Sequence, residues 1–138
     1  MGLPGSGKTT FAEKIVEEFK KREIGLTWFN ADEVRKRFDD WDFSEEGRLR
    51  QATRMRTLVD ESETEYNMVD MVAPLPEMRK ILNADHLVWM NTIQEGRFED
   101  TNKAFIRPEY NEIMMSLPAW GTKRDALSIV NMVTGQYK

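Results

Sequence analysis

The chain has 138 residues, a length typical of one domain that can bury a core. It carries 40% hydrophobic and 32% charged residues and a net charge of −4, which indicates a soluble globular protein and argues against a general nucleic-acid-binding surface. It has no cysteine, which excludes disulfides and thiolate metal sites. We find neither an apolar run long enough for a membrane span nor a signal peptide, so we expect a cytoplasmic protein without nucleic-acid or membrane partners.

The first motif along the chain is the glycine-rich segment Gly2-Leu3-Pro4-Gly5-Ser6-Gly7-Lys8-Thr9-Thr10. A glycine, four residues and then Gly-Lys-Thr is the pattern of a phosphate-binding loop. Backbone N–H groups in such a loop surround an anion, and the following helix directs the positive end of its dipole to the same place. We expect the segment to bind ATP, with Lys8 on the β- and γ-phosphates and the Thr9 hydroxyl on Mg²⁺. The alternative is a glycine-rich turn that precedes a helix by chance.

Helical segments and short apolar runs alternate after this motif. Segments typical of helices, by periodicity or capping residues, lie at 8–23, 34–38, 44–60 and 76–82. Runs typical of buried strands lie at 26–29, 66–73 and 86–90. Strands that alternate with helices predict a parallel sheet with right-handed crossovers. We therefore expect one α/β domain over 1–138, with the three-layer α/β/α architecture of phosphate-loop (P-loop) NTPases.

The last third of the sequence has weaker patterns. The polar and aromatic stretch 91–109 has no clear period, and such a stretch is usually a lid or an active-site loop, so we place a lid at about 92–109. Apolar spacing after Thr122 is consistent with a helix that ends at Gly135. We assign no role to the tail, 117–138.

One expected element is missing from the sequence. A phosphate-binding loop normally follows a buried central strand, and here only Met1 precedes Gly2. A central strand of about five apolar residues would contribute on the order of 8–15 kcal/mol, comparable to the ~5–15 kcal/mol net stability of a typical domain. Its absence would also leave unpaired N–H and C=O groups on two inner strand edges. We expect a marginally stable chain, a reading frame that starts upstream, or a gap filled by the segment after Thr122.

Two aspartates are candidates for the chemistry. Asp32 follows the strand at 26–29, where a carboxylate can orient or deprotonate an attacking hydroxyl group. Its alternative role is as the N-cap of the next helix. Asp70 stands in the middle of the predicted strand 66–73, where an unpaired charge is costly. Proximity to Thr9 and Mg²⁺ would explain it, and a salt bridge with a helix lysine is the alternative.

Arg35, Arg48 and Phe43 are candidates for binding the second substrate. Each arginine lies just after a strand end or near a helix start, and arginine suits bidentate binding of phosphate or sulfate. The alternative for both is a solvated surface charge. Phe43, beside the acidic turn 39–42, either stacks on a purine or anchors the loop.

From Gly2 to about Glu109 the sequence resembles the adenylyl-sulfate (APS) kinases, which transfer the γ-phosphate of ATP to the 3′-hydroxyl of adenosine 5′-phosphosulfate. The loop GLPGSGKTT is similar to the loop of that family. Residues 30–35 resemble its Asp-Gly-Asp-Asn-hydrophobic-Arg segment, with Asn30 in place of the first aspartate. Residues 43–48 resemble its Phe-Ser-x-x-Asp-Arg segment, and residues 73–79 its Ser-Pro-Tyr/Leu-x-x-x-Arg segment.

The resemblance implies a role for each matching residue. Asp32 would be the carboxylate on the hydroxyl side, Phe43 an adenine-stacking ring, and Arg35 and Arg48 ligands of the substrate. Residues with implied substrate contacts are Asp32, Arg35, Phe43, Arg48, Gln51, Pro74 and Leu75. The lid of the family is shortened here to 92–105, where Arg97 and Lys103 would replace its basic residues. We expect Arg97 on the ATP side.

The leading hypothesis is an ATP- and Mg²⁺-dependent kinase of adenosine 5′-phosphosulfate, a step of sulfate activation. The second is a kinase for another hydroxyl acceptor, such as a sugar acid or a nucleoside. The third is a truncated domain that binds nucleotide without turnover, which the missing strand and the short lid favour. The expected partner is a small-molecule substrate, and a homodimer is an open alternative to a monomer.

Overall fold

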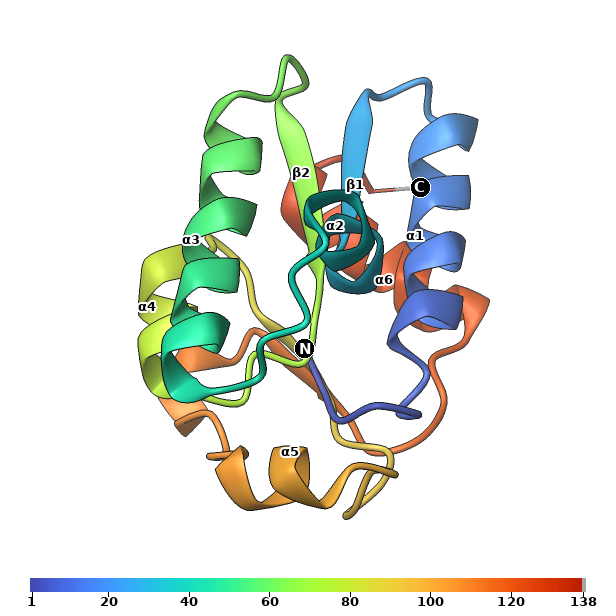
Figure 1. The fold of residues 1–138 in the computed structure, drawn as a ribbon. Coiled ribbons are helices and arrows are strands. Elements are labelled where there is room, and N and C mark those ends of the chain that lie inside the picture. Colours follow the sequence, from blue (N-terminus) through green and yellow to red (C-terminus); the bar gives the residue numbers. More distant parts are fainter. Residues whose placement is uncertain (138) are drawn as a thin grey trace.

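Helices and strands alternate along the chain in the computed structural model, which describes residues 1–137 (Figure 1). The elements in chain order are α1 (Lys8–Lys21), β1 (Leu26–Asn30), α2 (Ala31–Phe38), α3 (Glu45–Asp60), β2 (Tyr66–Asp70), α4 (Pro76–Leu82), β3 (Val88–Met90), α5 (Glu99–Ala104), the 3₁₀ turn η1 (Tyr110–Glu112), β4 (Met115–Leu117) and α6 (Lys123–Thr134). The expected helices 8–23, 44–60 and 76–82 are confirmed to within a few residues. None of the helices within 1–137 is long and apolar enough to cross a bilayer.

The strands form two parallel pairs. β1 pairs with β2 in a register that sets Leu26 beside Tyr66 and Asn30 beside Asp70. β3 pairs with β4, with Val88 beside Met115. The parallel arrangement that we expected is confirmed, and it brings the carboxyl ends of β1 and β2 together.

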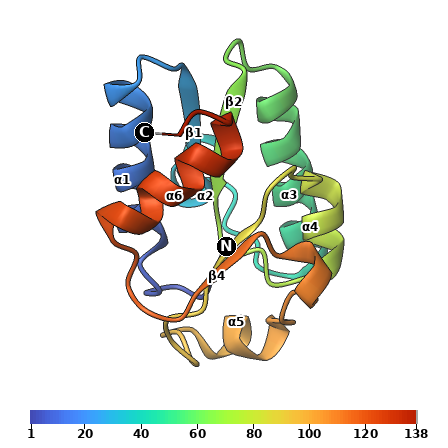
Figure 2. The same ribbon diagram turned by 180° about the vertical axis from the view of Figure 1, so that it is seen from behind.

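The two pairs are not joined into one sheet within residues 1–137. Met1 alone takes the position of a strand residue: its amino nitrogen donates to the Val88 carbonyl at 2.7 Å, and its own carbonyl accepts from the Met90 amide at 2.8 Å. The neighbouring Leu87 carbonyl accepts from the Met114 amide, on the side of β4. Since successive backbone groups of a strand point to opposite edges, Met1 pairs with the edge of β3 that faces away from β4. Figures 1 and 2 place the N-terminus in the middle of the molecule. The segment after Thr122 forms α6 and does not fill the gap.

The fold has two hydrophobic clusters, and the β1–β2 pair contributes to both: Leu26 and Tyr66 pack against the first, and Phe29 and Val69 against the second. The first cluster joins α1 and α6 to β3 and β4, with Phe11, Ile129 and Leu117 among its buried residues. The second joins α2, α3 and α4, with Met55 and Met78 fully buried. The strands lie behind α2 in Figure 1 and behind α6 in Figure 2, so helices cover them on both sides, as expected for a three-layer fold.

Three expectations need correction. β2 ends at Asp70 rather than near Ala73, so Asp70 is the last residue of the strand and not a mid-strand charge. The lid stretch contains the short helix α5. The strand β4 was not expected: it lies between the lid and the tail, and at three residues it is too short to show a period in the sequence.

Candidate phosphate-binding site

The loop before α1 has the backbone geometry of an anion site. Gly5 and Gly7 have φ angles of 86° and 93°, which side-chain-bearing residues rarely adopt, and the Ser6 amide closes a turn on the Leu3 carbonyl at 3.0 Å. Gly7 is the N-cap of α1 and has no side chain to satisfy the first N–H groups of the helix. Those N–H groups and the helix dipole therefore remain directed at a potential ligand.

Lys8 lies at the centre of a group of charged side chains. Its Nζ atom donates to the Leu3 carbonyl at 3.2 Å. Burial lowers the pKa of Lys8, the carboxylates of Asp70 and Asp32 oppose this, and Arg97 lowers the pKa further. The four side chains thus share one electrostatic environment, although they come from α1, α2, β2 and the lid.

Asp70 and Thr9 are in direct contact. The Thr9 hydroxyl donates to Oδ2 of Asp70 at 3.0 Å, and Nδ2 of Asn30 donates to the same oxygen at 2.9 Å. The neighbouring positions of Asn30 and Asp70 in the β1–β2 register produce this contact. Asp70 is buried, and its hydrogen-bond partners are these two side chains rather than the helix lysine that we considered as an alternative.

The pair fits a magnesium ion in kind and spacing. Mg²⁺ prefers oxygen ligands at about 2.0–2.1 Å in an octahedron, which sets neighbouring ligands ~3 Å apart. The residues that would hold it are Thr9 and Asp70. Within 1–137 no group of three or more acidic, histidine or cysteine side chains is arranged to hold a metal ion, but Mg²⁺ in nucleotide sites keeps waters and phosphate oxygens and needs few protein ligands.

Asp32 stands in the first turn of α2 with its side chain exposed. Asn30, not Asp32, is the N-cap, since its Oδ1 accepts from the Glu33 amide at 3.1 Å. The N-cap alternative for Asp32 is therefore wrong. No group within 1–137 donates a hydrogen bond to the Asp32 carboxylate, which leaves it available to a ligand near Lys8.

Arg35 and Arg48 are buried, at 4% and 5% exposure, so the solvated-charge alternative is wrong for both. Nη1 of Arg35 donates to the carbonyls of Asp40 and Asp42 at 3.0 and 3.3 Å. Nε of Arg48 donates to the Phe43 carbonyl at 2.8 Å. Burial lowers the pKa of both guanidinium groups. Both side chains therefore hold the turn 40–43 in place.

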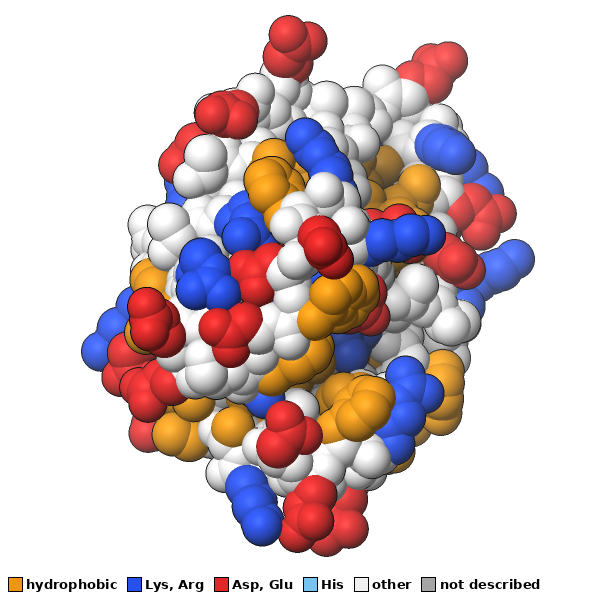
Figure 3. Space-filling view, in the orientation of Figure 1, with side chains coloured by type: hydrophobic (Ala, Val, Ile, Leu, Met, Phe, Trp, Pro, Cys, Tyr) orange, Lys and Arg blue, Asp and Glu red, His pale blue; other side chains and the backbone are white. Residues whose placement is uncertain are grey.

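Phe43 anchors the turn, which is one of the two roles that we considered. The guanidinium groups of Arg35 and Arg48 lie 4.4 and 5.6 Å from the centre of its ring, which anchors the turn. The residue is still 45% exposed. In Figure 3 hydrophobic side chains reach the surface over the lower half of this face, among charges of both signs.

The other residues implied by the resemblance have partners inside the protein. Nε2 of Gln51 donates to the Ala31 carbonyl at 3.1 Å and fixes α3 against α2. The carbonyl of buried Pro74 accepts from the Ile106 amide at 2.8 Å. Leu75 is the N-cap of α4, and its carbonyl accepts from the Met78 amide at 3.0 Å.

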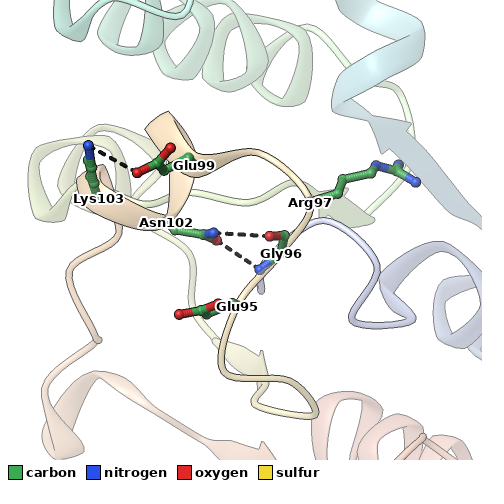
Figure 4. Close-up of a pocket in the computed structure, with 6 residues that line it drawn as sticks. All are labelled: Glu95, Gly96, Arg97, Glu99, Asn102 and Lys103. Carbon is green, nitrogen blue, oxygen red and sulfur yellow. Dashed lines mark hydrogen bonds and ion pairs between the residues drawn. The ribbon is translucent and has the colours of Figure 1, made fainter.

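The lid is attached to the phosphate-binding loop at its base, where the Thr92 hydroxyl donates to the Ser6 carbonyl at 2.7 Å. A hollow on the lid is lined by Glu95, Gly96, Arg97, Glu99, Asn102 and Lys103 (Figure 4). The Asn102 amide bonds both backbone groups of Gly96, and Lys103 pairs with Glu99. Arg97 points away from these side chains in Figure 4, and its charge reaches Lys8.

Trp120, which follows β4, was not among the residues expected at the site. Its ring lies against Gly7, so a β-carbon built on Gly7 would be 2.5 Å from Cζ3 of Trp120. The only local signal is the run Pro118-Ala119-Trp120-Gly121 between a short apolar stretch and a capped helix.

Fold and site together define a protein of the P-loop kinase-like class. The Mycobacterium tuberculosis APS kinase CysC, solved in complex with AMPPNP and APS, matches with a TM-score of 0.76 and 17% identity over 97% of this chain and 94% of that chain. A mutant of the same kinase matches with a TM-score of 0.74 and 19% identity, over 97% and 93%. The structure of APE1195 matches with a TM-score of 0.72 and 16% identity, over 100% and 94%.

At these identities the likeness shows the fold alone, and the expected P-loop fold is confirmed. The sequence model of the family described as chromatin associated protein KTI12 matches residues 1–97, well over half of the chain. The chain therefore belongs to the KTI12 family, and its resemblance to APS kinases holds at the level of the fold. Comparison with curated protein sequences gives no match.

Proposed function

We propose that this protein binds ATP with Mg²⁺ and transfers the γ-phosphoryl group to a hydroxyl acceptor. The observation that carries the proposal is the Thr9–Asp70 contact beside a glycine loop of anion-binding geometry, with the charges of Asp70 and Asp32 both acting on Lys8. A loop and a lysine alone would bind phosphate, whereas the exposed Asp32 carboxylate gives the site a group that can address an acceptor.

Each residue has a distinct task in this proposal. The loop amides and the α1 dipole hold the triphosphate, and Lys8 turns from the Leu3 carbonyl to the β- and γ-phosphates. Asp32 orients the acceptor hydroxyl and accepts its proton, and Arg97 adds positive charge from the lid. Bound Mg²⁺ would supply further charge neutralisation at the phosphates.

Adenosine 5′-phosphosulfate is the first acceptor to test. The sequence resemblance supports it, and so does the exposed ring of Phe43 beside two arginines. In this arrangement Arg35 and Arg48 would act mainly by fixing Phe43 and the turn 40–43 and by making that surface positive.

A second candidate is ATP turnover or binding without a small acceptor. It is favoured by the burial of Arg35 and Arg48, whose guanidinium groups donate to backbone carbonyls. An acceptor phosphosulfate would have to compete with these internal bonds.

A coupled ADP-release assay separates the candidates. It would be run with adenosine 5′-phosphosulfate, with a nucleoside, with a sugar acid and without acceptor, using the Lys8→Ala variant as the blank. ADP release that requires adenosine 5′-phosphosulfate supports the first acceptor. Equal release in all four reactions supports hydrolysis, and absence of ADP release together with absence of ATP binding would overturn the proposal.

A further inference from the structure

Trp120 lies in the loop 118–122, whose position on α1 is fixed by two contacts. Nζ of Lys14 donates to the Gly121 carbonyl at 2.7 Å. Gly121 is buried against the ring of Phe11, where any β-carbon would overlap the ring. The Thr122 hydroxyl then caps α6 in a capping box with Asp125. The loop is therefore held directly after the tryptophan, at Gly121 and Thr122, and before it the chain is fixed at Leu117, which is buried at the end of β4.

The indole touches the phosphate-binding loop at Gly7 yet remains open to solvent. A β-carbon on Gly7 would meet Cζ3 and Cε3 of Trp120 at 2.5 and 2.6 Å, so one edge of the indole touches the loop backbone. The residue as a whole is 57% exposed. A buried aromatic side chain normally removes 150–250 Å² of surface from solvent, and Trp120 buries less than half of its own surface. Packing alone therefore gives little reason for an indole at this position.

The two strand pairs separate the two sides of the site. Asp32 follows β1 and belongs to the β1–β2 pair, whereas Trp120 follows β4 in the β3–β4 pair. The loop amides near Gly7 would hold the α- and β-phosphates of a nucleotide, which are joined to the ribose and base. A ring that touches Gly7, on the side away from the candidate acceptor residues, lies within reach of that base.

We propose that Trp120 is the stacking platform for the base of the nucleotide that donates the phosphoryl group. This inference rests on the proposed function and extends it, because it gives the site a preference for nucleoside triphosphates over other polyphosphates. Base–aromatic stacking contributes ~1–3 kcal/mol per base, which corresponds to about 5- to 150-fold in affinity.

The test compares ATP with inorganic tripolyphosphate, which has the phosphates without the base. Calorimetric affinities for both, in the presence of Mg²⁺, would be measured for the full chain and for its Trp120→Leu and Trp120→Phe variants. Leucine keeps an apolar cover on Gly7 but has no aromatic face, and phenylalanine restores one. We expect Trp120→Leu to weaken ATP binding by about 10-fold or more and tripolyphosphate binding by less than twofold. Trp120→Phe should recover most of the lost ATP affinity.

Trp41→Leu is the matched control, because Trp41 is 50% exposed and lies in the turn 40–43, away from Gly7. It should leave both affinities unchanged. Equal losses of affinity for ATP and for tripolyphosphate in Trp120→Leu would mean that the indole only supports the loop. An unchanged ATP affinity would mean that the indole takes no part in binding. Either result overturns the inference. If the unaltered chain bound neither ATP nor tripolyphosphate, the proposed function itself would be overturned.

Discussion

The Thr9 hydroxyl and the Asp70 carboxylate meet at 3.0 Å although 61 residues separate them in the chain. The first belongs to the helix that follows the phosphate-binding loop, and the second ends β2. Their contact joins the start of α1 to the end of β2. The two oxygens are separated by the distance expected between neighbouring ligands of one hard cation.

Asp70→Asn should therefore remove most of the magnesium dependence of ATP binding. The substitution keeps the size of the side chain and its capacity to accept a hydrogen bond from Thr9, but removes the charge that attracts the cation. We expect the apparent Mg²⁺ affinity in the presence of ATP to fall at least about 10-fold. ATP affinity measured in EDTA should stay the same. A similar loss in EDTA would show that Asp70 supports the fold instead.

Lys8→Ala should abolish ADP release and weaken ATP binding. A charge-assisted contact to phosphate contributes ~1.5–3 kcal/mol, so we expect a loss of about 10- to 150-fold in affinity by calorimetry. Lys20→Ala is the control, because Lys20 is an exposed lysine of the same helix. Unchanged ATP affinity in the Lys8 variant would remove the loop from the mechanism.

Asp32→Asn should lower turnover strongly and leave ATP affinity nearly intact, because the carboxylate is proposed to act on the acceptor side. A general base typically contributes ~10²–10⁴-fold. Glu33→Gln, at the next position of the same helix and also exposed, removes the same charge without reaching the acceptor. A loss below about tenfold in kcat, or an equal loss in the Glu33 variant, would contradict the assignment.

The amino group of Met1 should make stability depend on pH. Burial lowers its pKa to about 5 from an ordinary 8.0, with a further contribution from the charge of Lys8. Between these values the unfolded chain binds more protons than the folded one, so the free energy of unfolding should rise from pH 5 to pH 8. Below pH 5 the amine is charged in both states and the whole cost of burying it is present. The rise should amount to roughly 2–4 kcal/mol.

Urea unfolding at several pH values would measure this effect. The N-acetylated chain is the control, since it cannot titrate at that position but keeps an N–H for the Val88 carbonyl. Identical pH profiles for the two forms would show that the amine does not carry the dependence.

The phosphate-binding loop could be predicted because its signal is local: glycines, a lysine and a threonine at fixed spacing decide both its backbone and its chemistry. The Asn30–Asp70 contact could not, because the register of a parallel pair depends on crossover geometry rather than on neighbouring residues. The cap of α2 was misassigned because asparagine and aspartate are nearly equal N-caps and both occur within three residues. Trp120 was missed because the strand before it has three residues, too few for a period.

Met1 contacts both hydrophobic clusters of the molecule. Its side chain packs against the cluster of α2, α3 and α4, while its backbone pairs with β3, which belongs to the other cluster. The phosphate-binding loop starts at the next residue, and the β1–β2 pair also contributes to both clusters. A nucleotide bound at this loop would therefore stabilise both clusters together, and the free energy of unfolding would rise with the concentration of the ligand relative to its Kd.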